Sequence, residues 1–387
     1  MSARNRELLG LVPASLLLTA GFAAVFIQRS NVLSNVSLTY GAIFLGLCLA
    51  AHVVIRLTLP YADPYMFPLV AALACFGIVM VYRIDSAEAR RQAEWFVIGL
   101  ILFAATIVLF RDYRKLERYR YTIVAVSLLI LALPRVPGIG QYTNGAYLAV
   151  KVPGLGGFQP EEFAKVGMVV FLASYLRDTR QVLVTGGRRI LGVTLPPVKH
   201  FGPILVIWGV AMAIMVLLSD MGSSLMLYGG LLAMLYVATG RFSFVLVGLL
   251  AFALGAWYLG THIAHVHARV EDWLHPFDPH LFNSALGSFQ VANGIFAQAA
   301  GGMFGQGFGQ SVLVFPGTHF HLIPFAETDM IYAVITDELG LFGAVALLVV
   351  YLLLIARGFK AAVLARDSFS TLLATGLTAI LAIQIFV

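Results

Sequence analysis

Several ionisable residues lie inside or at the edge of long apolar runs, where charge is costly and usually serves a purpose. Glu162 and Lys165 open one such run in the segment GFQPEEFAKVGMVVFL. Their i, i+3 spacing puts both side chains on one face of a helix, and Pro160 suits the first turn of that helix. Two interpretations are open: an ion pair that anchors the helix, or a cation that Glu162 holds ready for an anionic ligand.

Acidic residues also mark other apolar runs. Asp220 stands in the break SDMGSS between two runs, where it fits a helix cap or turn as well as a site residue. Asp329 opens another run in ETDMIYAVITDELG, and Asp337 and Glu338 follow some two turns deeper. Carboxylates at such depth need partners or water, which predicts a polar cavity that enters from one end of these runs.

Asp278 is the carboxylate best placed for acid–base chemistry in the long polar segment 265–328. It stands between Pro276 and Pro279, which restrict the backbone on both sides and favour a rigidly presented side chain. A positioned carboxylate that accepts a proton from a hydroxyl group typically accelerates a reaction by ~10²–10⁴-fold. The alternative is an ordinary Asp-Pro turn. Glu271 and Asp272 closely follow Arg269, and are expected to pair with it.

Histidines and glycines gather in or beside the same segment. The spacing of the seven histidines matches no zinc signature, so a histidine metal site is not expected (262, 265, 267, 275, 280, 319 and 321). The glycine run from Gly301 to Gly309 lacks the lysine of a phosphate-binding loop. We expect this run to be a flexible or closely packed segment.

The composition places the chain in a membrane. Of its 387 residues, 60% are hydrophobic and only 11% are charged, whereas soluble domains are about a quarter charged. Cys48 and Cys75 both lie within apolar runs, so a disulfide or a cysteine metal site is not expected. The first residues resemble a signal sequence, but the run that follows is nearer a full span and predicts an uncleaved first helix.

Eleven apolar runs approach the ~20 residues that a helix needs to cross a bilayer, which predicts an all-α polytopic membrane protein. They fall at about 8–27, 38–57, 66–82, 93–110, 120–134, 161–176, 203–219, 223–239, 242–264, 329–356 and 369–387. The fifth and sixth are on the short side. The seventh and eighth are expected to form a tight helical hairpin around Asp220.

The distribution of lysine and arginine predicts the orientation. With the N-terminus in the cytoplasm, seventeen of the 25 basic residues face inward and Lys165 lies within a span. Seven face outward: Arg29, Arg83, Arg90, Arg91, Arg135, Lys151 and Arg269. This bias follows the positive-inside rule and predicts that the large loop 265–328 is extracellular. The inner basic loops fit anionic lipid, and a nucleic-acid partner is not expected.

Six ordered segments resemble motifs of the SEDS family (shape, elongation, division and sporulation), the RodA/FtsW peptidoglycan polymerases. FQPEEFAK is similar to the family's Phe-Gln-Pro-Ser-Glu-Phe-Ala-Lys, and SDMGSS to its Pro-Asp-Leu-Gly-Thr turn. The others are RIDSAEARRQAEW, RDYRKLERYRY, FQVANGIFAQAAGGMFGQGFGQS and ETDMIYAVITDELGLFG. The resemblance covers most of the chain after the first two spans.

The sequence departs from the family pattern at a few places. Tyr147 and Leu148 stand where arginine and tryptophan are common, and the Trp273–Pro279 segment is one residue shorter between its prolines. Two spans precede the usual ten, as in actinobacterial members, so 1–60 is interpreted as an extra two-helix unit and 61–387 as the polymerase core. The family's last span is missing after Val387, which is interpreted as a C-terminal truncation.

The resemblance implies a function in cell-wall synthesis, for cell elongation or division. A glycosyltransferase of this family polymerises lipid II outside the bacterial cytoplasmic membrane, with undecaprenyl diphosphate as the leaving group. It works beside a class B penicillin-binding protein, a transpeptidase. Asp278 then corresponds to the catalytic base, and a divalent cation (Mg or Mn) is a possible cofactor. The corresponding substrate-binding residues are Lys165, Glu162, Asp220, Gln290, Thr328, Asp329 and Glu338.

Two other functions fit parts of the sequence. A lipid II flippase or transporter would suit the number of spans and the acids within them. However, a flippase needs polar residues along a path through both leaflets, and here they gather in the outer half. A scaffold that only holds a transpeptidase needs no charge inside the membrane. The enzyme is therefore the favoured interpretation.

Overall fold

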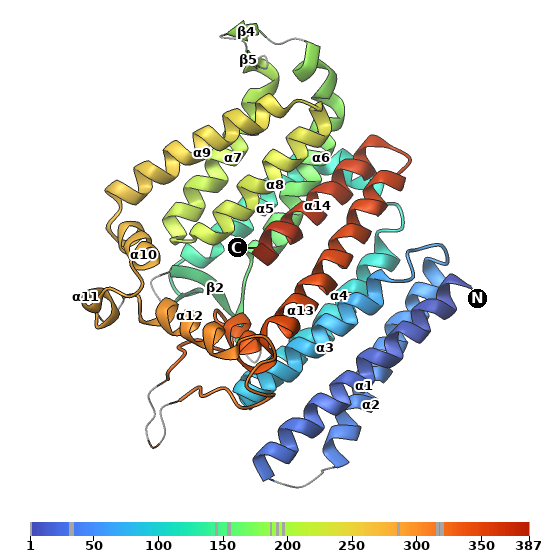
Figure 1. Cartoon of the computed structure of the whole chain (residues 1–387). Coiled ribbons are helices and arrows are strands. Elements are labelled where there is room, and N and C mark those ends of the chain that lie inside the picture. Colours follow the sequence, from blue (N-terminus) through green and yellow to red (C-terminus); the bar gives the residue numbers. More distant parts are fainter. Residues whose placement is uncertain are drawn as a thin grey trace. The chain divides into compact units, whose positions relative to one another are not determined.

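The computed structural model describes residues 2–30, 35–143, 146–152, 156–185, 188–190, 193–195, 198–284, 287–314, 317 and 321–386. The chain forms two compact units, each built from two stretches of sequence (Figure 1). Unit 1 comprises Met1–Arg111 and Leu254–Leu354, and unit 2 comprises Asp112–Ala253 and Ile355–Val387. Both units contain candidate site residues, so each is described separately.

Each of the eleven predicted runs corresponds to one helix of the described residues. These helices are α1 (Ala3–Ser30), α2 (Asn35–Thr58), α3 (Met66–Ile84), α4 (Ser86–Leu109), α5 (Arg120–Ala132), α6 (Glu161–Thr185), α7 (Val198–Leu218), α8 (Met221–Thr239), α9 (Phe242–His262), α13 (Ile331–Leu364) and α14 (Ser368–Phe386). The prediction of a helical, multi-pass membrane protein is confirmed.

The predicted count of eleven spans is not confirmed. Within the described residues, nine helices are long and apolar enough to cross a membrane, and α5 and α6 are not among them. With 13 residues, α5 extends roughly 20 Å at 1.5 Å per residue, short of a ~30 Å hydrocarbon core. The sequence of α6 carries charge near both ends, from Glu161 to Lys165 and again from Arg177 to Arg180.

The loops contain regular structure that the sequence reading did not predict. Two small antiparallel sheets form, one from β1 (Gly140–Thr143), β2 (Ala146–Val152) and β3 (Gly156–Phe158), and one from β4 (Arg188–Ile190) and β5 (Val193–Leu195). The large loop contains three short helices: α10 (Ala264–Leu274), α11 (Pro279–Phe282) and α12 (Phe289–Gly301). Short 3-10 turns, η1 (Tyr113–Tyr119) and η2 (Leu133–Arg135), flank α5.

In unit 1, the N-terminal helix pair is joined by a buried charged cluster. Figure 1 shows α1 and α2 side by side in dark blue, and α1 also packs against α3. Glu7 of α1 is fully buried, forms an ion pair with Arg4, and has its Oε1 2.7 Å from Nδ1 of His52 on α2. Arg4 also donates to the carbonyl of Ala62. Because the partners of a buried charge are costly to remove, this cluster holds the two helices together.

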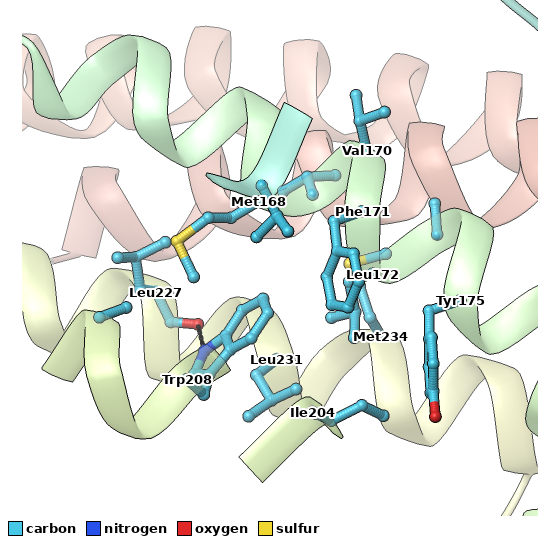
Figure 2. Close-up of a cluster of buried hydrophobic side chains, with 14 of the residues drawn as sticks. Met168, Val170, Phe171, Leu172, Tyr175, Ile204, Trp208, Leu227, Leu231 and Met234 are labelled. Carbon is cyan, nitrogen blue, oxygen red and sulfur yellow. Dashed lines mark hydrogen bonds between the residues drawn. The ribbon is translucent and has the colours of Figure 1, made fainter. Parts of the chain in front are cut away.

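In unit 2, α6 packs against α5, α8 and α14. Its residues from Met168 to Leu176 are all buried, and Figure 2 shows several of them against side chains from α7 and α8. Trp208 of α7 donates its indole N–H to the carbonyl of Leu227 on α8 at 3.2 Å, which satisfies the buried indole (Figure 2). This core fixes α6, and α6 carries Lys165 near its N-terminus.

The helix α13 is broken at Gly340, which has φ 68° and ψ −172°. A Cβ at this position would come within 2.3 Å of the Gly305 nitrogen, so the close approach requires glycine. The glycine run lies against the break: Gln306 N donates to Asp337 O at 2.8 Å, and Leu341 N donates to Gly302 O at 2.9 Å. Of the two expectations for this run, close packing is the one the structure shows.

Candidate functional site

In unit 2, Lys165 is the centre of a charged group at the start of α6. Its side chain is only 3% exposed, and its Nζ lies 2.7 Å from Oε1 of Glu162 and 3.8 Å from Oε1 of Glu161. The Sδ of Met226 is a weak acceptor 3.8 Å from the same nitrogen. The Glu162 side chain is 46% exposed. The lysine is therefore buried, whereas one of its carboxylate partners faces the exterior.

Asp220 belongs to the same group. It caps α8 by accepting a hydrogen bond from Ser223 N at 3.0 Å, and Ser223 Oγ donates to Glu161 Oε1 at 2.8 Å. Ser223 thus links Asp220 to Glu161, since its backbone N–H donates to the first carboxylate and its hydroxyl group donates to the second. Burial raises the pKa of Asp220, but hydrogen bonds from Glu161 and Ser223 outweigh it, so this pKa lies below the usual aspartate value.

Glu161 and Ser223 were not identified by the sequence reasoning. Glu161 stands where the resembled motif has serine, and its i, i+4 spacing from Lys165 was the available signal. Lys165 carries three N–H donors. Glu162 accepts one at 2.7 Å, whereas Glu161 at 3.8 Å is beyond ordinary hydrogen-bond distance. The group therefore retains donor capacity for an anionic oxygen.

In unit 1, Asp278 is exposed and precedes the short helix α11. Its Oδ1 accepts a hydrogen bond from His280 N at 2.8 Å, and Pro279 takes the first helical position. The sequence offered an Asp-Pro turn and a carboxylate held by its backbone as alternatives. In the structure, Asp278 lies in an Asp-Pro turn and its carboxylate also caps α11. The cap uses Oδ1 and fixes the side chain, while the exposed carboxylate remains accessible to a hydroxyl group.

Three further predicted residues, Gln290, Thr328 and Asp329, lie near a turn at Phe325. Gln290 of α12 donates its Nε2 to the carbonyl of Pro324 at 3.2 Å. Phe325 has φ 55°, a left-handed conformation, and its carbonyl accepts the N–H groups of Thr328 and Asp329 at 3.2 Å and 2.9 Å. Thr328 and Asp329 are both exposed. Partial burial raises the pKa of the Asp329 carboxyl, as does the neighbouring Glu327.

Glu338, the last of the predicted residues, is buried beneath the glycine run. Its Oε2 accepts a hydrogen bond from Gly309 N at 2.8 Å, and its Oε1 lies 3.2 Å from Arg83 of α3. Arg83 also donates to the carbonyls of Gly309 and Ser311 at 2.7 Å and 3.1 Å. The buried Asp337 adjoins this network. The charge pattern of the sequence places Arg83 only as an outward charge, whereas in the structure it connects α3, α13 and the large loop.

The predicted site residues thus form one compact group in unit 2 and several separate positions in unit 1. Lys165, Glu162 and Asp220 are brought together in unit 2. In unit 1, Asp278 lies in the large loop, and Glu338 lies in the network with Arg83.

No group of three or more His, Cys, Asp or Glu side chains that could hold a metal ion occurs among the described residues; His319 lies outside them. Mg²⁺ is commonly held by one or two carboxylates plus substrate phosphates, so the cation remains a prediction for the substrate complex and no step below depends on it.

The family model of the FtsW/RodA/SpoVE cell cycle proteins matches residues 64–387 of this sequence. The chain belongs to this family. Within the family, it is 37% identical to the peptidoglycan glycosyltransferase RodA of Mycobacterium tuberculosis over 99% of this chain and 82% of that protein. It is also 31% identical to a probable peptidoglycan glycosyltransferase FtsW of Geobacter metallireducens, over 84% of each.

Solved structures agree with the family assignment. A chain of a peptidoglycan synthase complex that coordinates polymerization and crosslinking matches with a TM-score of 0.64 and 26% identity, over 84% of this chain and 86% of that one. The rod shape determining protein RodA of Thermus thermophilus matches with a TM-score of 0.56 and 25% identity, over 84% and 83%. The helical fold of this chain is therefore that of the family.

Proposed function

We propose that this protein is a peptidoglycan glycosyltransferase that polymerises lipid II into glycan strands. The observation that carries the proposal is the 37% identity to a RodA glycosyltransferase along 99% of the chain. The geometry supplies two groups that such a reaction uses. One is an exposed carboxylate held by its backbone, and the other is a buried cation with unused donor capacity.

Asp278 acts as the general base in this proposal. A sugar hydroxyl is too weak an acid to attack an anomeric carbon unaided, and a carboxylate that accepts its proton during attack lowers the barrier. Because an α-linked donor gives a β-linked product, the hydroxyl attacks from the face opposite the diphosphate. The cap to His280 N holds the Asp278 side chain in place before the acceptor arrives.

Lys165 stabilises the leaving diphosphate. Negative charge develops on the bridging oxygen as the glycosidic bond breaks, and a fixed cation in a site with little water opposes that charge effectively. Glu162 and Glu161 hold the ammonium in position. Asp220 caps α8 at Ser223, and the hydroxyl group of Ser223 donates to Glu161, so the role of Asp220 in this proposal is to position the group.

The surroundings of the enzyme follow from the same proposal. The large loop faces the outside of the bacterial cytoplasmic membrane, where the acceptor sugar lies, and the N-terminus is cytoplasmic. A class B penicillin-binding protein that crosslinks the strands is the proposed partner. A role for this chain in such an assembly is supported by its similarity to a chain of a peptidoglycan synthase complex.

Fluorescent lipid II supplied to the purified full chain in proteoliposomes tests this function. We expect long glycan strands that a muramidase degrades. The main alternative, a flippase, would instead move labelled lipid II to the opposite leaflet and leave it as monomer. Transfer without polymer would overturn the proposal.

A further inference from the structure

A pocket of about 420 Å³ lies in unit 1 among α1, α2, α3 and α4, and none of the site residues discussed above lines it. Its walls are mainly apolar and aromatic. Phe44 and Phe96 stack with their ring centroids 5.2 Å apart, and the ring of Phe22 lies 4.7 Å from that of Tyr82. Small-molecule sites commonly have volumes of about 300–1,000 Å³ and a similar apolar lining.

All of the lining lies toward one end of the four helices. Phe22 belongs to the C-terminal half of α1, Phe44 to the N-terminal half of α2, and Tyr82 to the last turn of α3. Arg83, the next residue, donates to the carbonyls of Gly309 and Ser311 in the large loop. The pocket is therefore in the leaflet on the side of the large loop.

The pocket runs from the headgroup level into one leaflet. Along α4 the lining extends from Ser86 to Val97, roughly 16 Å at 1.5 Å per residue. From Arg90 to Val97 the lining extends about 10 Å, which accommodates the part of an acyl chain nearest the headgroup within the ~15 Å hydrocarbon half of one leaflet. Polar lining residues (Tyr40, Tyr82, Ser86 and Arg90) lie toward the loop end. Tyrosines are typical of the level of the lipid headgroups.

Arg90 supplies a cation at this polar end. Its side chain is 84% exposed and its Nε lies 3.3 Å from Glu94 Oε1. An exposed ion pair of this kind contributes little stability, so the guanidinium can turn to another acceptor. A phosphate is a stronger partner because it accepts two parallel hydrogen bonds from arginine. The adjacent Arg91, by contrast, pairs with Glu88 and does not line the pocket.

We propose that this pocket binds a glycerophospholipid, with one acyl chain between α1, α2, α3 and α4 and the phosphate on Arg90. The apolar depth accepts the chain, and the polar end accepts the headgroup. The site lies among the N-terminal pair and the first two helices of the region that the family model matches. A lipid bound there bridges the N-terminal pair to α4. The inference is independent of the proposed glycosyltransferase activity.

Photo-crosslinking tests the site. The full chain is placed in phosphatidylcholine nanodiscs with a small share of phosphatidylglycerol that carries a diazirine on one acyl chain. We expect crosslinked peptides to concentrate on the lining of α1, α2 and α4. Ala93→Trp fills the pocket. Arg90→Gln removes the cation, and because the Arg90 side chain is exposed the substitution should leave the fold intact. Each should lower crosslinking by about tenfold, whereas the matched control Arg91→Gln should leave it unchanged.

Three results would overturn the proposal. Crosslinks spread evenly over all the helices would show only general contact with lipid. Equal effects of Arg90→Gln and Arg91→Gln on crosslinking would show that the phosphate does not bind at Arg90. Displacement of the label by unlabelled polyprenyl phosphate would identify a polyprenyl lipid as the occupant instead. Because Ala93→Trp can disturb folding, its elution by size exclusion is compared with wild type, and Arg90→Gln provides the second variant.

Discussion

At the scale of single residues, the group around Lys165 shows how a charge is kept in an apolar environment. A buried ammonium is costly unless it is paired and hydrogen-bonded. Here Glu162 pairs with it at 2.7 Å, while Glu161 lies 3.8 Å away and accepts a hydrogen bond from Ser223. The result is a cation that is fixed in position and not fully saturated with acceptors.

Lys165→Met tests the role of this cation. We expect glycan synthesis from lipid II to be abolished, because nothing else in the group opposes the charge on the leaving diphosphate. Stability should also fall, by about 1.5–3 kcal/mol, because the substitution removes the charged hydrogen bond to Glu162. Polymer yield and the thermal unfolding midpoint are measured together.

Glu162→Gln is the matched control for Lys165→Met. It removes a half-exposed carboxylate and leaves Lys165 with Glu161. Its loss of stability should be much smaller. If Lys165→Met polymerises lipid II at the wild-type rate, Lys165 has only the structural role of anchoring α6.

The sequence allowed some of these residues to be identified and concealed others. Glu162, Lys165 and Asp220 were recognisable because they interrupt apolar runs. The pair of Arg83 and Glu338 was not, because its members come from α3 and α13 and meet only in the folded chain. Local spacing carries no information about such long-range contacts.

At the scale of elements, the break in α13 determines how the large loop is held. The left-handed Gly340 interrupts the helix, and the freed backbone groups bond with the glycine run. Irregular backbone at membrane depth is tolerated where protein satisfies its hydrogen bonds, as it does here.

Gly340→Ala tests this junction. An added Cβ would lie 2.3 Å from Gly305 N, and a φ of 68° is unfavourable for alanine. We expect a destabilisation of several kcal/mol, seen as a lower thermal midpoint or loss of the folded protein. Gly99→Ala in α4 is the control because open space surrounds it, and it should stabilise the helix by about 0.5–1 kcal/mol. Equal midpoints for the two variants would contradict this role of Gly340.

The start of α14 depends on Asp367. Its Oδ1 accepts a hydrogen bond from Ser370 N at 2.9 Å, and its Oδ2 pairs with Arg114 at 2.9 Å. The hydrogen bond from the Ser370 backbone is the main reason that the pKa of Asp367 is lowered. A carboxyl group whose pKa is lower in the folded state than in the unfolded state stabilises the fold. This stabilisation is fully present when the pH is above the unfolded-state pKa of about 3.9, and it is lost as the pH falls through the folded-state pKa.

Asp367→Ala should therefore cost about 1 kcal/mol at neutral pH, as other lost caps do. The difference from wild type should shrink as the pH is lowered below about 4. Thermal unfolding across pH measures both effects. The control is Asp112→Ala, whose carboxylate lies 3.6 Å from Lys115 in an exposed pair. A difference that persists unchanged in acid would contradict a contribution from the ionised carboxylate.

The sequence predicted helices far better than loop structure. A long apolar run indicates a helix whichever elements pack against it, so each of the eleven runs corresponds to a helix. The sheet from β1 to β3 has short strands in a segment with several glycines, and its pairing depends on contacts across the turn. The span count also depends on context, because α5 is short and α6 carries charge near both ends.

At the scale of the whole molecule, orientation in the membrane is the property on which the proposed function most depends. The acceptor sugar of cell-wall synthesis is outside the membrane, so the large loop must also be outside. The count of basic residues predicts this orientation. The native cysteines, Cys48 and Cys75, are both buried and give little background in labelling experiments.

Ser284→Cys reports the side of the large loop. Ser284 is exposed, unlike Ser311 of the same loop, which is buried. An impermeant maleimide should label this cysteine on intact spheroplasts. Ser2→Cys, exposed at the N-terminus, should be labelled only after permeabilisation. The reverse pattern would invert the proposed topology.

The central claim is that this chain polymerises lipid II with Asp278 as the base. Asp278→Asn keeps the size and capping ability of the side chain but removes its basicity. Its polymerisation rate, measured on fluorescent lipid II with the full chain in proteoliposomes, should fall by ~10²–10⁴-fold. Asp272→Asn in the same loop should retain most of the activity. A near wild-type rate for Asp278→Asn, with Asp272→Asn equally active, would contradict the account.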